Sequence, residues 1–315
     1  MSIFKTTKIN YYIKNYFLFY TAKRYKNKAS EKINLIHNHP DKAYIKERVD
    51  YYNKLQNPFS IDDQWENITL FHKTHKKNAY FFDTILHLKY FKWMHKIKYA
   101  FGDVTYIPKT PSFVKSRPIC DDNENSILLK LDKIRHFHFI KDHQKFDDKK
   151  NILVWRGDSR NRPHRVKLLQ KLWNHPMCDI GQTQDPIEDV PWQKGKLTIE
   201  EQLRCKFILC IEGFDVATNL KWAMSSNSLV FSYPLKYETW YMEGTLIENH
   251  HFVVIKEDLS DLEEKLNYYI DHPNEAKKII KNANDYIVQF KDKKREDLIS
   301  LLVIEKYFNF QKEKE

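Results

Sequence analysis

The segment at residues 206–234, KFILCIEGFDVATNLKWAMSSNSLVFSYP, constrains the fold of this chain most strongly. Residues 207–211 form an apolar run of strand length, and Glu212 and Gly213 interrupt it. Residues 220–224 give a helix its apolar face, and a second buried strand begins at residue 229. Strand, glycine turn, helix and strand in this order predict part of a parallel α/β sheet.

The loop inside this segment is a candidate ligand site. Asp215 or Thr218 is expected to cap the helix. The carboxyl end of a parallel strand and the N-terminus of the next helix form a crevice in which ligands, often phosphates, bind. Ordinary α/β structure without a ligand is the alternative that the local pattern leaves open.

Composition limits the class of protein. The chain has 315 residues, 42% hydrophobic and 30% charged, which is typical of a soluble globular protein with one large or two ordinary domains. The net charge of +11 and the pI of about 9.1 come mainly from lysine. They indicate a solvated lysine-rich surface or attraction to an anionic partner such as nucleic acid, an acidic membrane or a phosphorylated substrate.

Cysteine usage and hydropathy favour a cytoplasmic location. The four cysteines form no CxxC pair, so neither a zinc site nor a disulfide framework is expected. We expect no membrane span, because no run of about 18 apolar residues occurs, and no signal peptide. Residues 1–32 mix aromatic and basic side chains, which predicts either a helix lying on an anionic membrane or a helix that packs on the domain and exposes its lysines.

The middle of the chain contains a proline-rich stretch and a polar stretch. Gly102 and Asp103 predict a turn, residues 104–107 a strand, and Lys115 and Arg117 follow in an extended segment. His136 and His138 would share one face of a later strand, where surface or hydrogen-bonding roles are favoured over metal binding. The polar residues 141–150 are the candidate linker between two domains.

An arginine cluster opens the second half of the chain. Residues 152–155 predict a buried strand, and Pro163 suits the first turn of a helix. Four arginines lie between the strand and this helix: Arg156, Arg160, Arg162 and Arg165. Because a guanidinium group binds phosphate oxygens through two parallel hydrogen bonds, an anion site is favoured over a simple surface cluster. Further on, Thr198 and Glu201 predict a capping box.

Residues 102–308 resemble glycosyltransferase family 90, the CAP10-like group, and most closely its bacterial lipopolysaccharide branch. The segments that carry the resemblance are VKSRPI, NSILLKLDKIRHF, WRGDSRNRPHR, LRCKFILCIEGFDVATNLKWAMSSNSLV and YETWYMEGTLIENHHFVVIKEDLSDLEEKL. The resemblance implies an α/β GT-B-like fold, with two Rossmann-like domains facing a cleft and C-terminal helices. The corresponding domains are residues 1–145 on the acceptor side, 150–290 for the nucleotide sugar, and a C-terminal helix at 291–315.

The resemblance also implies an activity. It implies an inverting transfer of a hexose from a nucleotide sugar, a UDP-hexose, to a lipopolysaccharide core or a similar lipid-linked surface glycan. It implies no cofactor and no essential metal, which agrees with the absence of an Asp-x-Asp triplet from the sequence. The expected location is the cytoplasm, peripheral on the inner membrane. The alternatives are a transferase for capsule or protein O-glycosylation, and a non-catalytic nucleic-acid-binding protein.

The same resemblance suggests site residues. The donor residues implied or expected are Arg156, Gly157, Arg165, Gly213, Asp215, Thr218, Asn219, Lys221 and Glu238, with Glu243 as a further carboxylate for sugar hydroxyls. Asn219 departs from the family, since eukaryotic members have arginine there, so Lys221, Arg156 or Arg165 would supply the charge. Asp103 is the expected base, with Asp121 and Asp122 as rivals, and Lys115 and Arg117 are expected on the acceptor side.

Overall fold

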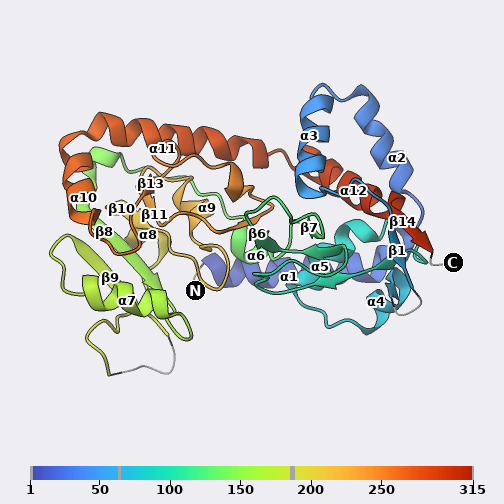
Figure 1. The fold of residues 1–315 in the computed structure, drawn as a ribbon, viewed down its shortest axis with the longest axis horizontal. Helices are drawn as coiled ribbons and strands as arrows, with labels where there is room; N and C mark the ends of the chain where they lie inside the picture. The colour runs from blue at the N-terminus through green and yellow to red at the C-terminus, as the bar shows by residue number, and fades with distance from the viewer. Residues whose placement is uncertain (1–2, 63–64, 185–188, 314–315) are drawn as a thin grey trace. The chain divides into compact units, whose positions relative to one another are not determined.

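The structure is a computed structural model that describes residues 3–62, 65–184 and 189–313. Its contacts divide the chain into two compact units (Figure 1). Unit 1 comprises Met1–His136, Tyr237–Tyr241 and Phe290–Glu315, and unit 2 comprises Phe137–Lys236 and Met242–Gln289. The sequence-based division placed its first boundary about ten residues later and treated the C-terminal helix separately, whereas the contacts group that helix with the N-terminal residues.

Unit 2 is built on a five-stranded sheet in which every pairing is parallel. Its strands lie in the order β13 (Val253–Val254), β11 (Leu229–Ser232), β10 (Cys205–Leu209), β8 (Lys150–Gly157) and β9 (Cys178–Gln182). The helices of this unit are α7 (Pro163–Leu172), α8 (Ile199–Gln202), α9 (Leu220–Ala223), α10 (Leu262–Asp271) and α11 (Pro273–Ile287). The predicted mixed α/β class is therefore confirmed.

The core of unit 2 explains why these segments become strands. Alternate positions of β8, β10 and β11 contribute to one apolar cluster: Leu153, Trp155, Phe207, Leu209, Leu229 and Phe231. Apolar residues of α7, α10 and α11 complete the cluster, so these helices pack against the same face of the sheet. The intervening residues Val154, Ile208 and Val230 are buried as well, as expected for a parallel sheet covered on both faces.

Of the two helix caps predicted in unit 2, one is confirmed and one is wrong. The capping box is confirmed, because the Thr198 side chain and the Glu201 side chain each bond the other's backbone N–H. The predicted cap of α9 is wrong: Asn219, and not Asp215 or Thr218, occupies the N-cap position, and its side chain makes no capping bond. The amide of Asn219 instead donates to the carbonyl of Leu209, which ties α9 to β10.

Unit 1 is mainly helical and has only small sheets in its described part. Its helices are α1 (Ile3–Thr21), α2 (Ala29–Ile33), α3 (Lys42–Tyr52), α4 (Ile68–Thr74), α5 (Ala79–Leu88), α6 (Lys133–His136) and α12 (Lys293–Asn309). A parallel sheet joins β4 (Tyr99–Ala100), β5 (Ser112–Val114) and β7 (Ser126–Leu128). Three strand pairs complete the unit: β1 (Phe59–Ile61) with β14 (Gln311–Glu313), β2 (Glu66–Asn67) with β3 (Lys96–Ile97), and β6 (Ser116–Pro118) with β12 (Tyr237–Thr239).

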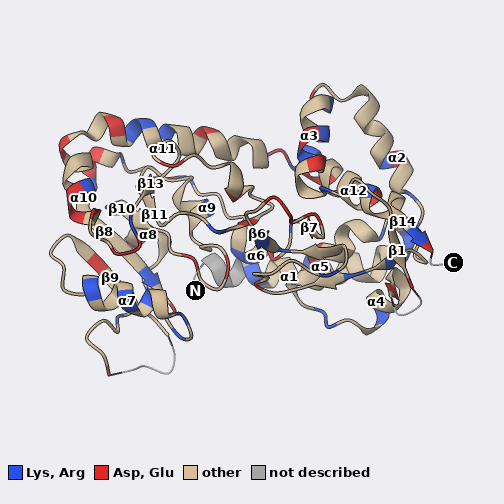
Figure 2. Cartoon of the chain, viewed as in Figure 1, with Lys and Arg blue, Asp and Glu red and all other residues tan. Residues whose placement is uncertain are grey.

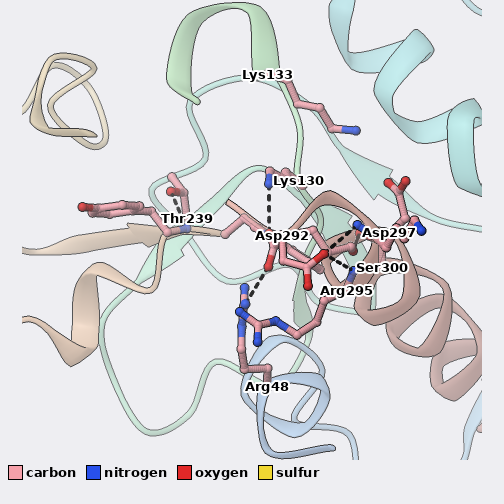
Figure 3. Close-up of polar contacts among 12 residues, drawn as sticks. Arg48, Lys130, Lys133, Thr239, Asp292, Arg295, Asp297 and Ser300 are labelled. Atoms are coloured by element: carbon pink, nitrogen blue, oxygen red, sulfur yellow. Dashed lines mark hydrogen bonds and ion pairs between the residues drawn. The ribbon is translucent and has the colours of Figure 1, made fainter. Parts of the chain in front are cut away.

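The buried carboxylate of Glu296, on α12, holds three distant segments of unit 1 together. It accepts hydrogen bonds from Arg48 of α3 at 2.5 Å and from Lys130 at 2.9 Å, two residues that Figure 3 labels. The indole N–H of Trp240, next to β12, donates to the same carboxylate at 2.6 Å. Because the carboxylate is buried, its paired and hydrogen-bonded state is required to offset its desolvation.

Two strand predictions in this unit are wrong. Residues 104–107 form no strand, because the backbone N–H and C=O of Val104 bond the Ser116 hydroxyl and not a neighbouring strand. His136 lies in the short helix α6 and His138 in irregular structure, so the two do not share a strand face.

Candidate active site

The carboxyl ends of β8 and β10 mark the point at which the strand order of unit 2 reverses. Numbered along the chain, the strands lie in the order 2-1-3-4-5, with β8 as the first and β10 as the third. Open parallel sheets bind ligands at such a reversal, outside the carboxyl ends of the two strands. Helix α7 begins here at Pro163, so its positive N-terminal end adds to the basic residues of this region (Figure 2).

Arg165 lies at the centre of this reversal point. Its guanidinium group donates to the carbonyls of Ile211 at 2.7 Å, Glu212 at 2.9 Å and Asp158 at 2.8 Å, and so joins the loops that follow β10 and β8. Burial, and then the charge of Arg162, lower the pKa of Arg165 to about 10, against the opposing effect of Asp158. Arg165 therefore stays cationic at neutral pH in a place where an added anion would stabilise it.

Arg162 lies beside Arg165 and is also incompletely compensated. Its guanidinium carbon lies 4.0 Å from the centre of the Phe214 ring, and one terminal nitrogen donates to the carbonyl of Arg160. The Nε of Arg162 is buried and has no hydrogen-bond partner. A buried N–H without a partner is costly, so this atom is a candidate donor to a bound ligand.

The charges around α7 do not balance. Asp158 pairs with Arg160 at 2.5 Å and lies 3.6 Å from Arg162. Among the residues that the structure describes, no carboxylate forms an ion pair with Arg165. In the described part of the chain, the Asp158 carboxylate pairs with Arg160 and Arg162, and no carboxylate pairs with Arg165. This surplus of positive charge at a helix N-terminus suits a phosphate or diphosphate.

Two glycines border the cluster for different reasons. At Gly213 a Cβ atom would lie 3.5 Å from Arg165 and 3.6 Å from Arg162, at ordinary contact distances, so sterics alone do not demand glycine there. At Gly157 a Cβ would lie 2.4 Å from the Trp155 indole. Because Trp155 is buried and cannot move away freely, Gly157 is needed for packing whether or not a ligand binds nearby.

Arg156 differs from its neighbours, because its side chain is fully engaged within the protein. It forms a two-point ion pair with Asp179 of β9 at 2.8 and 2.9 Å. Its remaining donors bond the carbonyls of Trp155, Asp179 and Gly195. Each of the three guanidinium nitrogens therefore has a hydrogen-bond partner within the protein. The geometry makes Arg156 a link between β8, β9 and the following loop, and its charge is balanced by Asp179.

The other residues of unit 2 that are expected to bind the nucleotide-sugar donor lie after β10. Asp215 is buried and Thr218 is half-buried in the loop before α9. Lys221 of α9 is fully buried and pairs at 2.5 Å with Glu243, which is equally buried. A lysine so enclosed by a carboxylate contributes no surplus charge, so Arg162 and Arg165 are better placed than Lys221 to compensate for the arginine that the family resemblance expects at residue 219.

Glu238 is expected to bind the sugar donor, and Arg117 is expected on the acceptor side. In unit 1 these two residues contact each other. They are opposite residues of the antiparallel pair β6–β12, and the Arg117 Nε donates to the Glu238 carboxylate at 2.7 Å. Tyr51 donates to the same carboxylate. Arg117 also bonds the carbonyls of Tyr51 and Ser126. The pair is buried, and its contacts hold β12 to the rest of unit 1.

Asp103 and Lys115 also meet in unit 1. The Lys115 ammonium group is buried, and it bonds the carboxylate of Asp103 at 2.5 Å. The Asp103 side chain keeps about a third of its surface exposed, 31%, so an acceptor hydroxyl can approach it. Asp121 and Asp122 are exposed in the loop after β6.

Three residues of the site region were missed by sequence reasoning. His164 bonds the carbonyl of Glu212 at 2.9 Å, Asp158 pairs with two of the arginines, and Asp179 holds Arg156. The sequence offered one signal, since His164 and Asp158 lie inside the arginine cluster. Nothing in it connected Asp179 to Arg156, because that contact depends on the pairing of β8 with β9.

The described part of the chain contains neither a metal-ligand cluster nor a membrane-spanning helix. Within residues 3–62, 65–184 and 189–313, no group of three or more His, Cys, Asp or Glu side chains is arranged to hold a metal ion. No helix in the described part of the chain has the length and apolar character needed to cross a membrane.

Comparison with known proteins decides the family. The model of glycosyl transferase family 90 matches residues 131–314. O-glucosyltransferase LpsA of Dichelobacter nodosus is 41% identical over 268 residues, which are 85% of this chain and 84% of that protein. The chain belongs to glycosyltransferase family 90. A family 90 protein transfers a sugar from a donor to an acceptor, and this favours the glycosyltransferase interpretation over a non-catalytic nucleic-acid-binding protein.

A solved structure, that of TarM, overlaps this family 90 chain only in part. The overlap covers 59% of this chain and 38% of the TarM chain, at 15% identity and a TM-score of 0.36. A likeness of this size does not establish a shared fold.

The family match at residues 131–314 includes the whole arginine cluster of unit 2, whereas Asp103, Lys115 and Arg117 precede it.

Proposed function

We propose that this family 90 glycosyltransferase moves a hexose from a UDP-hexose to a lipopolysaccharide core or a similar lipid-linked surface glycan, with inversion and without a metal or another cofactor. The name of the relative, an O-glucosyltransferase, supports glucose as the hexose. The GT-B arrangement, the cytoplasmic location and the association with the inner membrane belong to the proposal on the strength of the family resemblance.

The observation that carries the proposal is the surplus of positive charge at the strand reversal of unit 2. The leaving group of a nucleotide sugar is a diphosphate that gains negative charge as the bond to the sugar breaks. Arg165, the unpartnered Nε of Arg162 and the N-terminus of α7 converge where parallel sheets bind phosphates. Positioned cations of this kind stabilise the transition state more than the ground state, and so accelerate the transfer.

The transfer also needs a base. The acceptor hydroxyl oxygen attacks the anomeric carbon, the bond from that carbon to the diphosphate breaks, UDP leaves, and the hydroxyl proton passes to a carboxylate. We assign the base to Asp103, whose carboxylate is partly exposed and is held by Lys115. The ion pair fixes the orientation of the carboxylate, while its free oxygen is available to accept the proton.

The donor is tested by turnover with a panel of nucleotide sugars in the presence of EDTA. We expect release of UDP from a UDP-hexose, preferably UDP-glucose, with a rate that EDTA does not change. Loss of activity on chelation, restored by manganese or magnesium, would contradict the metal-independent mechanism. Turnover of a nucleotide sugar other than a UDP-hexose, with none for UDP-hexoses, would contradict the donor assignment.

The base is tested by Asp103→Asn, which keeps the size of the side chain and removes its basicity. We expect the turnover number to fall by about 10²–10⁴-fold with unchanged UDP affinity and melting temperature. Asp121→Asn and Asp122→Asn are matched controls at exposed positions and should turn over like wild type. Near-normal transfer by Asp103→Asn, or a collapse in either control, would assign the base elsewhere.

A further inference from the structure

Helix α1 presents apolar residues on two different faces. One face packs on α5: the Tyr11 hydroxyl donates to Asp83 at 2.8 Å, and the rings of Tyr12 and Tyr16 contact Phe82 edge-on. Further along, Phe19 contacts Phe81. These contacts make α1 an integral part of unit 1.

The other face is exposed and also apolar. Ile9, Ile13, Phe17 and Tyr20 keep 50%, 64%, 70% and 78% of their surface exposed, and Tyr16, which also contacts Phe82, keeps 41% at the border of the two faces. At 3.6 residues per turn the five fall within an arc of about 100°. We call these five residues the apolar stripe. A helix that packs on the domain was expected to expose its lysines, but this exposed face consists of aliphatic and aromatic side chains.

The charge around the stripe has one sign. Residues 1–30 contain no Asp or Glu, and they contain seven basic residues: Lys5, Lys8, Lys14, Lys23, Arg24, Lys26 and Lys28. An apolar helical face in a segment whose charged residues are all basic is the pattern of a helix that lies in the interface of an anionic membrane.

A basic pocket adjoins the end of α1. Its volume is about 540 Å³, and its lining includes Phe19, Lys23, Lys26, Lys73 and Trp93. The three lysines are exposed and form no ion pair with a carboxylate in the described part of the chain. The pocket therefore has a positive charge that no carboxylate among the described residues of unit 1 pairs with.

Three stacked or tilted rings line the pocket beside the lysines, those of Phe19, His72 and Trp93. His72 stacks on the Phe19 ring at 4.3 Å and lies 4.8 Å from the Trp93 ring. Burial lowers the pKa of His72, against a hydrogen bond to the Phe19 carbonyl, so the imidazole is neutral at physiological pH. Uncharged rings beside three lysines suit a group with a phosphate and an adjoining uncharged part.

We propose that α1 and this pocket form a membrane-docking surface, in which the stripe enters the interface of an anionic bilayer and the lysines bind the phosphate of a lipid headgroup. A bilayer fits better than nucleic acid, because Ile9 and Ile13 offer neither a stacking platform nor a hydrogen bond to bases, whereas aliphatic side chains insert readily among acyl chains.

The test is sedimentation of the full chain with vesicles, which requires neither donor nor acceptor and so succeeds or fails independently of the proposed transfer. We expect binding to vesicles with about a third phosphatidylglycerol and little binding to pure phosphatidylcholine. Ile13→Ser/Phe17→Ser should reduce binding at least tenfold. Lys23→Glu/Lys26→Glu should reduce it by more than 25-fold, since each lysine near an anionic surface contributes a factor of about five.

Two double variants in unit 2 serve as matched controls. Ile247→Ser/Val288→Ser removes apolar side chains of similar exposure, 58% and 57%, and Lys277→Glu/Lys281→Glu reverses two exposed lysines. Both should bind vesicles like wild type. Equal binding by the α1 variants and wild type, or no preference of wild type for anionic vesicles, would overturn the proposal. So would binding of free glycerol phosphate at the pocket without binding to vesicles.

Discussion

Arg156 and Arg165 lie nine positions apart at the same end of unit 2, but their surroundings are opposite. Arg156 is neutralised by Asp179, and each of its guanidinium nitrogens bonds a group of the protein. Arg165 bonds only carbonyls and has no described carboxylate partner. A phosphate would therefore be attracted to Arg165, and removal of Arg156 would chiefly damage the sheet.

Arg156→Ala should accordingly act on stability. The substitution leaves Asp179 with Lys194 alone and removes the links from β8 to β9 and to Gly195. We expect the free energy of unfolding to fall by about 2 kcal/mol, because broken charge-assisted hydrogen bonds at a partly exposed pair have effects of this size. Urea unfolding measures the change, with the exposed Arg204→Ala as control. Wild-type stability with weakened UDP binding would instead make Arg156 a donor ligand.

The sequence was sufficient to predict the arginine cluster, but not which of its arginines is neutralised within the protein. The spacing of Arg156, Arg160, Arg162 and Arg165 follows from a strand end and a helix start, both of which were predicted. Which guanidinium group is neutralised depends on Asp179, more than 20 residues away on a neighbouring strand. Likewise, nothing in the one-dimensional pattern joined Arg117 to Glu238.

At the scale of elements, the buried contact between α5 and α12 makes stability depend on pH. His87 lies 3.2 Å from Asp297 and is buried. Burial lowers the pKa of His87 to about 4, although Asp297 opposes the shift. In the unfolded chain an ordinary histidine has a pKa of about 6.5, so between pH 6.5 and 4 the unfolded state binds more protons than the folded state.

Stability should therefore fall as the pH falls from about 6.5 to 4, by up to roughly 3 kcal/mol from this group. Urea unfolding of wild type and His87→Gln across this range isolates the contribution, because other titrating groups are common to both. The difference between the two proteins should narrow toward low pH. His143→Gln, at an exposed position, should follow wild type. Parallel curves for wild type and His87→Gln would contradict the assignment.

Elements with a strong local signal were predictable. β8, β10 and β11 follow apolar runs, α7 begins at a proline, and the capping box of α8 was visible as two residues. The short strands of unit 1 were not predictable, because strands of two or three residues have no periodicity of their own. The strand predicted at residues 104–107 does not form, because the Ser116 hydroxyl bonds the Val104 backbone groups that a partner strand would otherwise bond.

At the scale of the whole molecule, the chain passes between its units several times. β12 and the residues after it leave unit 2 for unit 1, as does α12, and Glu296 and Glu238 fix these segments there. The sequence predicted a linker at residues 141–150, whereas the contacts place the first crossing between His136 and Phe137. The sequence offered no signal for the later crossings, because each of them depends on a buried polar contact with residues more than 100 positions away. The three central strands of the parallel sheet, β8, β10 and β11, in contrast follow from their own apolar segments, whereas β9 lies in a segment whose sequence is typical of a loop.

The central claim is that Arg165, at the reversal of this sheet, binds the diphosphate of the donor. Calorimetric titration of UDP and of uridine into wild type and Arg165→Ala tests it most directly. We expect Arg165→Ala to weaken UDP binding by roughly 10–150-fold, as the loss of one charge-assisted bond of about 1.5–3 kcal/mol requires, and to leave uridine binding unchanged. Equal UDP affinity in the two proteins, with folding intact, would contradict the account.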